Sequence, residues 1–189
     1  MARTGPQGRI TRGTTGTNRL RRVDRWIAQL PAFRAAERPL VVDLGYGATP
    51  HTAVELFDRL RLVNPHVEVL GIEIDPARVE AARGAERPGL SFRLGGFEVP
   101  SERAPTIIRA LNVLRQYDES EVAATWAQLR GRIAPGGAIV EGTCSENGRV
   151  GTWVTLSPQG PETLTLGLHL GSLELPSIAA ELTLQTVPA

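Results

Sequence analysis

The feature that most constrains the fold is a regular alternation of short apolar runs with helix-forming segments over residues 40 to 143. The expected strands cover residues 40 to 44, 67 to 74, 90 to 94, 106 to 111 and 138 to 143. Strands separated by helices pair in parallel through right-handed crossovers. The alternation therefore predicts an α/β fold, a three-layer and mostly parallel sheet with helices on both faces.

Residues that start helices follow several of these strands. Thr49 precedes a proline and is expected to cap one helix, while Asp75 and Pro76 form the cap and first position of the next. Asp118 and Glu121 have capping-box spacing, with Asp in place of the usual Ser or Thr. These signals predict helices that begin at the carboxyl ends of the strands.

The pattern changes after Gly148. Two β-rich runs, residues 152 to 156 and 163 to 168, flank a Pro-Gln-Gly-Pro turn, and they predict a β-hairpin. A short helix is expected over residues 176 to 182. We expect this hairpin and helix, residues 151 to 189, to complete the same domain as a core over residues 36 to 150.

The first 35 residues are expected to form a basic arm and an amphipathic helix. Residues 1 to 26 contain seven arginines and one acid, Asp24. The first 17 residues lack periodicity and indicate a flexible or ligand-ordered arm. From Asn18, a plausible cap, apolar residues recur at helical spacing until Pro31 stops the pattern. Such an arm could contact phosphate, but a solvated charged tail is commoner, so a small-molecule partner is favoured over nucleic acid.

The turn after the first strand, Asp43-Leu44-Gly45-Tyr46-Gly47, combines an acid with two glycines at a helix start. Glycine lets the backbone turn sharply and approach a ligand, and a helix amino terminus offers free N–H donors. Because ligands of parallel sheets bind beyond the carboxyl ends of the strands, this turn is the first candidate site.

The second strand ends in two acids that share a face, Glu73 and Asp75. An acid at this place can accept hydrogen bonds from both hydroxyls of a ribose. Asp75 is better used as a helix cap before Pro76, which leaves Glu73 for the ribose. The two strand ends together predict a ribose-containing ligand.

Residues 39 to 144 resemble the class I, Rossmann-like, S-adenosylmethionine-dependent methyltransferases. In that family the acid-x-Gly-x-Gly loop holds the methionine part of S-adenosylmethionine, which implies this role for Asp43, Gly45 and Gly47. The resemblance also matches Glu73 with the acid of the second strand and residues 135 to 137 with the proline and double-glycine turn before the fifth strand.

The chain departs from the family after the third strand. Many members have an aspartate there that recognises the adenine amino group, whereas this chain has Gly96. We expect backbone groups and the ring of Phe97 to hold the adenine instead. The full set of expected cofactor-binding residues is Asp43, Gly45, Tyr46, Gly47, Glu73, Ile74, Gly96, Phe97 and Asn112. A second departure is the hairpin, which follows the fifth strand almost directly.

The resemblance implies an enzyme that transfers a methyl group from S-adenosylmethionine to an unidentified acceptor, more often a small molecule. One alternative is a non-catalytic protein that binds S-adenosylmethionine or a related nucleoside. A dehydrogenase using a nicotinamide cofactor is disfavoured, because its G-x-G-x-x-G/A fingerprint lacks an acid two residues ahead.

Substrate contacts are expected from the arm and from segments beyond the fourth and fifth strands. The expected substrate-binding residues are Arg12, Arg19, Arg115 and Tyr117, with Arg109, Glu141 and Glu146 as further candidates. Arg109 and Arg115 could instead pair with helix acids. No residue is assigned as a catalytic base, and His51 is expected to be exposed or locally bonded.

Composition narrows the remaining possibilities. No apolar run is long enough to cross a bilayer, and the amino terminus lacks the apolar core of a secretory signal, so a cytoplasmic location without membrane contact is expected. The single cysteine, Cys144, cannot form an intramolecular disulfide or a cysteine-cluster metal site, and no metal is expected. The hairpin edge leaves room for a homodimer.

Overall fold

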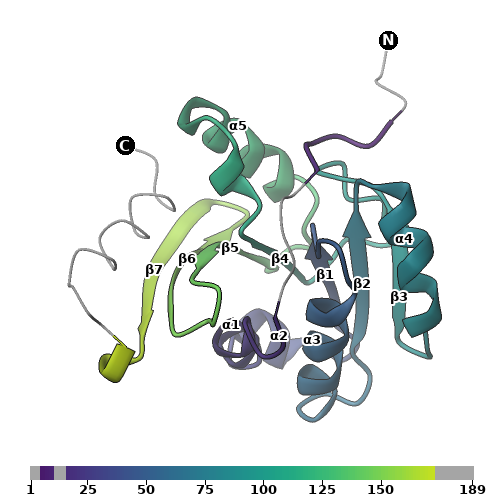
Figure 1. Ribbon diagram of the computed structural model, residues 1–189, viewed down its shortest axis with the longest axis horizontal. Helices are drawn as coiled ribbons and strands as arrows, with labels where there is room; N and C mark the ends of the chain where they lie inside the picture. The colour runs from purple at the N-terminus through teal and green to yellow at the C-terminus, as the bar shows by residue number, and fades with distance from the viewer. Residues whose placement is uncertain (1–4, 11–15, 173–189) are drawn as a thin grey trace.

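Seven strands form one sheet in the computed structural model, which describes residues 5–10 and 16–172. The order across the sheet is β3-β2-β1-β4-β5-β6-β7 (Figure 1). The strands are β1 Leu40–Leu44, β2 Glu68–Glu73, β3 Leu90–Leu94, β4 Ile107–Leu111, β5 Ala138–Cys144, β6 Val150–Ser157 and β7 Gly160–Leu168. The first five run parallel, and β6 and β7 form an antiparallel hairpin beside β5, so the predicted Rossmann-like sheet and hairpin are confirmed.

The strand order reverses at β1, which lies between β2 and β4. Asp43 in β1 is therefore level with Gly71 of β2 on one side and with Arg109 of β4 on the other. Such a switch point is where ligands bind in parallel α/β sheets.

Helices cover both faces of the sheet. They are α1 Arg21–Ile27, α2 Pro31–Ala35, α3 His51–Arg61, α4 Pro76–Ala82 and α5 Glu119–Arg130, with short 3-10 turns η1 Arg83–Ala85, η2 Leu114–Gln116 and η3 Leu170–Ser172. Ile27, Phe57 and Val79 belong to one apolar core, which places α1, α3 and α4 on the same face. Trp126 and Leu129 of α5 pack in the core on the other face (Figure 1).

Two of the four expected helix caps are confirmed. The Asp75 side chain accepts a hydrogen bond from the backbone of Ala77 at 2.9 Å. Asp118 and Glu121 form the capping box at the start of α5. The prediction for Thr49 is wrong, since its hydroxyl bonds the His51 ring at 2.9 Å and the cap position falls on the following proline.

The amino-terminal helix also differs from expectation. It begins at Arg21 with Leu20 as its cap, because Asn18 has a left-handed φ of 62° and donates its N–H to the Glu55 carboxylate. Pro31 does end the first pattern, but it also starts α2, since a proline fits the first position of a helix. The helix expected over residues 176 to 182 lies outside the described residues.

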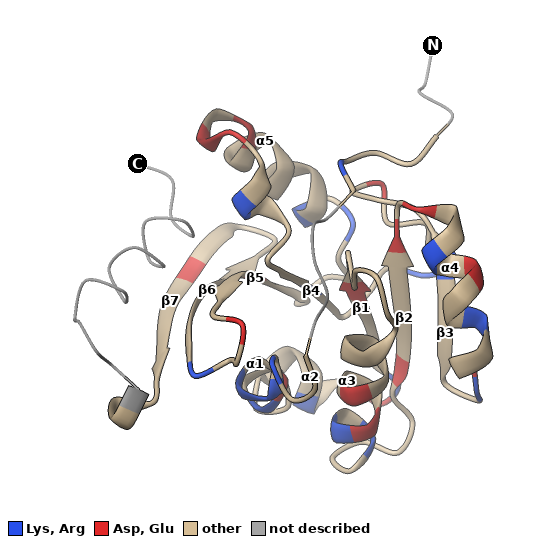
Figure 2. Cartoon of the chain, viewed as in Figure 1, with Lys and Arg blue, Asp and Glu red and all other residues tan. Residues whose placement is uncertain are grey.

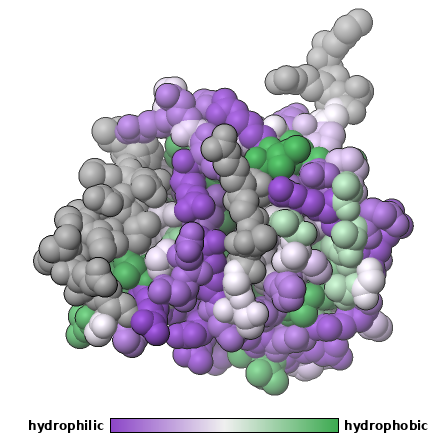
Figure 3. All heavy atoms as spheres, in the orientation of Figure 1, coloured by the Kyte–Doolittle hydropathy of each residue, from purple (hydrophilic) through white to green (hydrophobic). Residues whose placement is uncertain are grey.

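The visible surface is mostly hydrophilic, with small separate hydrophobic patches (Figure 3). Leu62, Leu164 and Leu170 are among the exposed large apolar side chains. Within residues 5–10 and 16–172, no helix combines the length and apolar character needed to cross a membrane.

Candidate functional site

A pocket lies at the carboxyl ends of β1, β2 and β3, where the sequence predicted a ligand site. Acidic residues mark the ends of β1 and β2 in Figure 2. The lining of the pocket comes from three strand ends, from the segment after β4 and from the amino-terminal segment. The lining residues are Gln7, Gly8, Arg9, Leu44, Gly45, Glu73, Ile74, Gly95, Gly96, Phe97, Val113 and Tyr117.

The glycine loop connects β1 to α3 through two left-handed residues. Gly45 has φ 70° and Gly47 has φ 89°, values that residues with a side chain rarely adopt. The Gly45 N–H donates to the Ile72 carbonyl at 2.8 Å, so the loop stays attached to β2 while it turns. Of the two glycines, Gly45 lines the pocket and Gly47 does not.

Glu73 ends β2 with its carboxylate at the pocket wall and 1% of its surface exposed. One oxygen accepts the Gly47 N–H at 2.9 Å, and the other accepts the Ile74 N–H at 3.1 Å. Burial raises the pKa of Glu73, and the Gly47 N–H and the nearby Arg78 guanidinium oppose that rise. The acid is thus held in a fixed position between the glycine loop and the pocket.

Asp43 does not line the pocket. Its carboxylate accepts the Thr52 hydroxyl at 2.8 Å and the Nε–H of Arg109 at 3.0 Å, and 3% of the residue is exposed. The second carboxylate partner of Arg109 is Asp24 of α1. Asp43 therefore connects the glycine loop to the buried core through Thr52 and Arg109.

The expectation that Arg109 faces the substrate is wrong, and the alternative of pairing with acids is confirmed. Arg109 is fully buried in the middle of β4. A cation there needs buried partners, and the carboxylates of Asp43 and Asp24 supply them.

Tyr46 was also expected at the cofactor, but the structure places its side chain in the core. Its ring packs edge-on against Phe92 with 5.2 Å between centroids, and 2% of the residue is exposed. Its hydroxyl donates to the Arg78 carbonyl at 3.3 Å. The side chain points away from the pocket because the left-handed glycines on either side reverse the chain there.

Asn112, another expected cofactor contact, lies outside the pocket lining and joins β4 to β5. Its side-chain oxygen accepts the Cys144 N–H and the Thr143 hydroxyl, each at 3.0 Å. Its amide group donates to the Cys144 sulfur at 3.4 Å. The Cys144 side chain is buried, as expected for a small core residue.

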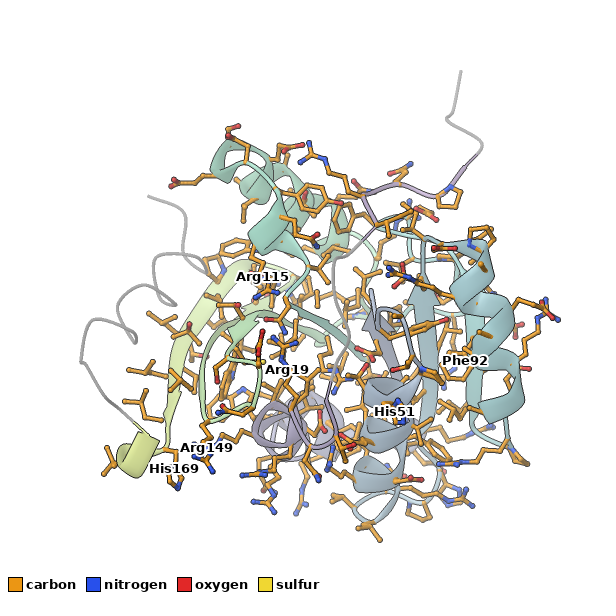
Figure 4. The ribbon with its side chains drawn as sticks, in the orientation of Figure 1. Arg19, His51, Phe92, Arg115, Arg149 and His169 are labelled. Carbon is orange, nitrogen blue, oxygen red and sulfur yellow. The ribbon has the colours of Figure 1, made fainter. Side chains whose placement is uncertain are left out.

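The expected substrate residues are dispersed. Arg12 lies outside the described residues. Arg19 is buried and donates to the carbonyls of Ser145 and Cys144, each at 3.0 Å. It therefore links the segment before α1 to the end of β5 and is not a free cation for a substrate. Arg115 is exposed, and Figure 4 shows it with Arg19 between α5 and α1. Tyr117 lines the pocket.

Glu141 and Glu146 differ in their exposure to solvent. Glu146 is exposed after β5, whereas Glu141 is buried within β5, so the expectation that Glu141 faces the substrate is wrong. Burial raises the pKa of Glu141 to about 8. The indole of Trp126 lowers that pKa only in part, and its N–H makes no hydrogen bond of normal geometry.

The sequence predicted contacts from the amino-terminal arm at Arg12 and Arg19, but not at the arm residues that line the pocket, Gln7, Gly8 and Arg9. Residues 7 to 9, named here the strap, line the pocket and hydrogen-bond to the segment that follows β3. Gly8 was the available signal, but its neighbours Ile74, Phe97 and Tyr117 lie 66 or more positions away along the chain.

Comparison with curated proteins gives a partial match. The chain is 36% identical over 114 residues to a trans-aconitate 2-methyltransferase of Methylobacterium radiotolerans, across 59% of this chain and 41% of that protein. The chain thus spans less than half the length of this relative. The similarity supports the resemblance to methyltransferases. No family model matches the chain.

Solved structures give distant matches. Human N-acetylserotonin methyltransferase in complex with SAM is 21% identical, with a TM-score of 0.48 over 67% of this chain and 35% of that one. The N-methyltransferase NodS from Bradyrhizobium japonicum is 16% identical, with a TM-score of 0.47 over 65% and 66%.

Proposed function

We propose that this chain is an S-adenosylmethionine-dependent methyltransferase that acts on a small-molecule acceptor. The observation that carries the proposal is the buried Glu73 carboxylate at the end of β2, beside the left-handed Gly45 and level with the switch point of the sheet. A relative with a methyltransferase name supports it.

The residues around the pocket fit such a cofactor. Glu73 is in place to accept ribose hydroxyls, and Gly45 leaves backbone at the pocket wall where a side chain would intrude. Ile74 and Phe97 supply apolar surface for an adenine ring. When bound, S-adenosylmethionine supplies a methyl group on a sulfonium.

This chain's own contribution is binding and alignment. Methyl transfer is an in-line displacement, which a protein accelerates mainly by holding donor and acceptor in line. The Asp43 and Arg109 pair holds the glycine loop rigid from below, and Asn112 holds the ends of β4 and β5 together. These contacts keep the strand ends, where donor and acceptor meet, in a fixed arrangement.

The acceptor class is open to a direct first test. The relative is named for trans-aconitate, so this tricarboxylate and related polycarboxylates are the first acceptors to assay. Arg115 is an exposed cation beyond β4 that could receive a carboxylate. We also propose a cytoplasmic setting and a homodimer through β7, the edge strand of the sheet in the part of the chain that the structure describes, which sedimentation analysis tests.

The decisive test is calorimetry with S-adenosylhomocysteine on the full chain and two variants. Glu73→Gln removes the charge at the pocket, and Glu68→Gln removes an acid at the opposite end of the same strand. We expect Glu73→Gln to weaken binding about tenfold or more and Glu68→Gln to leave it unchanged, because a hydrogen bond to a charged group contributes about 1.5 to 3 kcal/mol. Equal binding by all three proteins would overturn the site.

Turnover of labelled S-adenosylmethionine then separates an enzyme from the alternative. Gly96 in place of the adenine-reading acid favours that alternative, a nucleoside-binding protein without catalysis. Binding without transfer to any carboxylate, hydroxyl or amine acceptor would favour the binder.

A further inference from the structure

The backbone of Gln7 holds the strap at the pocket through two hydrogen bonds, one to a backbone N–H and one to a side chain. The Gln7 carbonyl accepts the Phe97 N–H at 2.8 Å, and the Gln7 N–H donates to the Glu98 carboxylate at 2.8 Å. Backbone groups here are expected to hold the adenine, and the Phe97 N–H is one such donor at the pocket. A segment of this chain therefore already occupies it.

Gly96 gives the strap its room. A side chain at position 96 would place its first carbon 1.9 Å from the Gln7 carbonyl oxygen, far inside any permitted contact. The family resemblance led us to expect an adenine-reading acid at this position. Glycine here admits the strap where that acid would exclude it.

Gly8 fits against the pocket because it has no side chain. Its φ is 140°, and an added carbon would lie 3.1 Å from the Tyr117 hydroxyl and 3.6 Å from both Ile74 and Phe97. The strap backbone thus rests directly on the apolar surfaces that line the pocket. Position 8 requires glycine for both its conformation and its space.

Side chains on α5 and before it hold the two ends of the strap. Gln128 donates to the Gln7 side chain at 2.6 Å. The Tyr117 hydroxyl accepts the Arg9 N–H, and the Arg9 guanidinium lies over the Tyr117 ring and pairs with Glu121 at 3.0 Å. The Arg9 pair is solvent-exposed, and exposed ion pairs contribute little stability, so this end can be released.

Little space remains beneath the strap. The cavity between it and the strand ends has a volume of about 20 Å³, room for about one water molecule. On its outer side the strap borders an open hollow of about 470 Å³ next to α5. A nucleoside can enter the pocket only after the strap has moved, and the outer hollow gives it a place to move into.

We propose that the strap is an internal competitor for the nucleoside pocket, which S-adenosylmethionine must displace in order to bind. The proposal rests on the proposed function, since it takes the ligand to be this cofactor. Affinity for the cofactor then equals the intrinsic affinity multiplied by the fraction of molecules with the strap released.

Two glycine substitutions test the strap in the full chain. Gly8→Val places a branched side chain at a left-handed position against Tyr117 and should release the strap. Gly5→Val is the matched control, because an added carbon at Gly5 meets nothing within 4 Å. By calorimetry with S-adenosylhomocysteine, we expect Gly8→Val to bind about tenfold more tightly than the unaltered chain and Gly5→Val to match it.

Hydrogen exchange gives an independent readout on the unaltered chain. The Arg9 N–H donates to the Tyr117 hydroxyl, and it should exchange faster when S-adenosylhomocysteine is added. The Phe97 N–H should stay protected, because its partner is Gln7 before binding and the ligand after it. Slower exchange at Arg9 would mean that the strap closes over the ligand, and it would overturn the proposal.

The binding outcomes separate the two ideas. Equal affinity in all three proteins, or weaker binding by Gly8→Val alone, would overturn the strap as a competitor and leave the cofactor assignment standing. No binding by any of the three would overturn the proposed function and the competitor with it.

Discussion

The Nε–H of Arg109 donates to the Asp43 carboxylate at 3.0 Å in the buried layer beneath the glycine loop. The same guanidinium reaches Asp24 on α1, so one cation connects β4, β1 and the amino-terminal helix. The loop that carries Gly45 is therefore anchored by a charge network rather than by apolar packing alone.

Removal of the Arg109 charge should be costly. Arg109→Met leaves Asp43 buried without its cation, and breaking a buried ion pair on one side typically costs about 3 to 5 kcal/mol. Arg115→Met, at an exposed arginine, should change the free energy of unfolding by less than about 0.5 kcal/mol. Urea denaturation of both variants measures the difference, and similar midpoints would contradict a structural role for Arg109.

Glu141 should make stability depend on pH. Its pKa in the folded chain is about 8, above the ordinary 4.5, so the folded state holds a proton that the unfolded state releases between these values. Stability therefore falls as pH rises through this window, by several kcal/mol in total. Glu141→Gln cannot release a proton and should flatten the fall.

Thermal denaturation of the unaltered chain and Glu141→Gln at pH 5 and pH 8.5 checks this difference. The variant should gain in relative stability at the higher pH. A gap between the two proteins that is the same at both pH values would show that Glu141 does not titrate in this range.

Asn112 combines a left-handed backbone with side-chain bonds, and two substitutions separate these. Its φ is 63°, and its side chain bonds Thr143 and Cys144. Asn112→Gly loses only the side-chain bonds, at about 1 to 2 kcal/mol, and Asn112→Ala adds about 1 kcal/mol of backbone strain. Chemical denaturation should rank the glycine variant above the alanine variant, and the reverse order would refute the strain.

Gly71 makes room for the ring pair behind the glycine loop. An added carbon would lie 2.5 Å from the Phe92 ring and 3.1 Å from the Tyr46 ring. Gly71→Ala should therefore destabilise the chain by about 1 to 3 kcal/mol through overpacking. Gly84→Ala is the control, since nothing lies within 4 Å of a carbon added there. Equal melting temperatures for the two variants would exclude the clash.

Much of the fold follows from local signals. Alternating apolar runs and helix caps predicted the five parallel strands, because periodicity and capping depend on residues close together in the chain. The hairpin after β5 followed from its turn residues in the same way. The predicted caps at Thr49 and Asn18 are wrong, because Thr49 bonds His51 and Asn18 bonds Glu55 instead of capping a helix.

The predicted site residues that line the pocket lie mostly at strand ends, and Tyr117, which follows η2, is the exception. Gly45, Glu73, Ile74, Gly96 and Phe97 line one pocket because the carboxyl ends of parallel strands lie together, and their contact with a cofactor stays a prediction. Tyr46 was misplaced because its direction depends on the turn between two left-handed glycines, and Arg109 because nothing local to β4 reveals that Asp24 packs against it.

The sequence by itself determined the sheet, the glycine loop and the acid that ends β2, since each depends on short-range pattern. Only the tertiary structure decided that Arg109 lies beneath the loop and that Gln7 meets Phe97. These contacts join residues 66 and 90 positions apart, and a chain-local pattern carries no information about pairs brought together by the packing of the whole core.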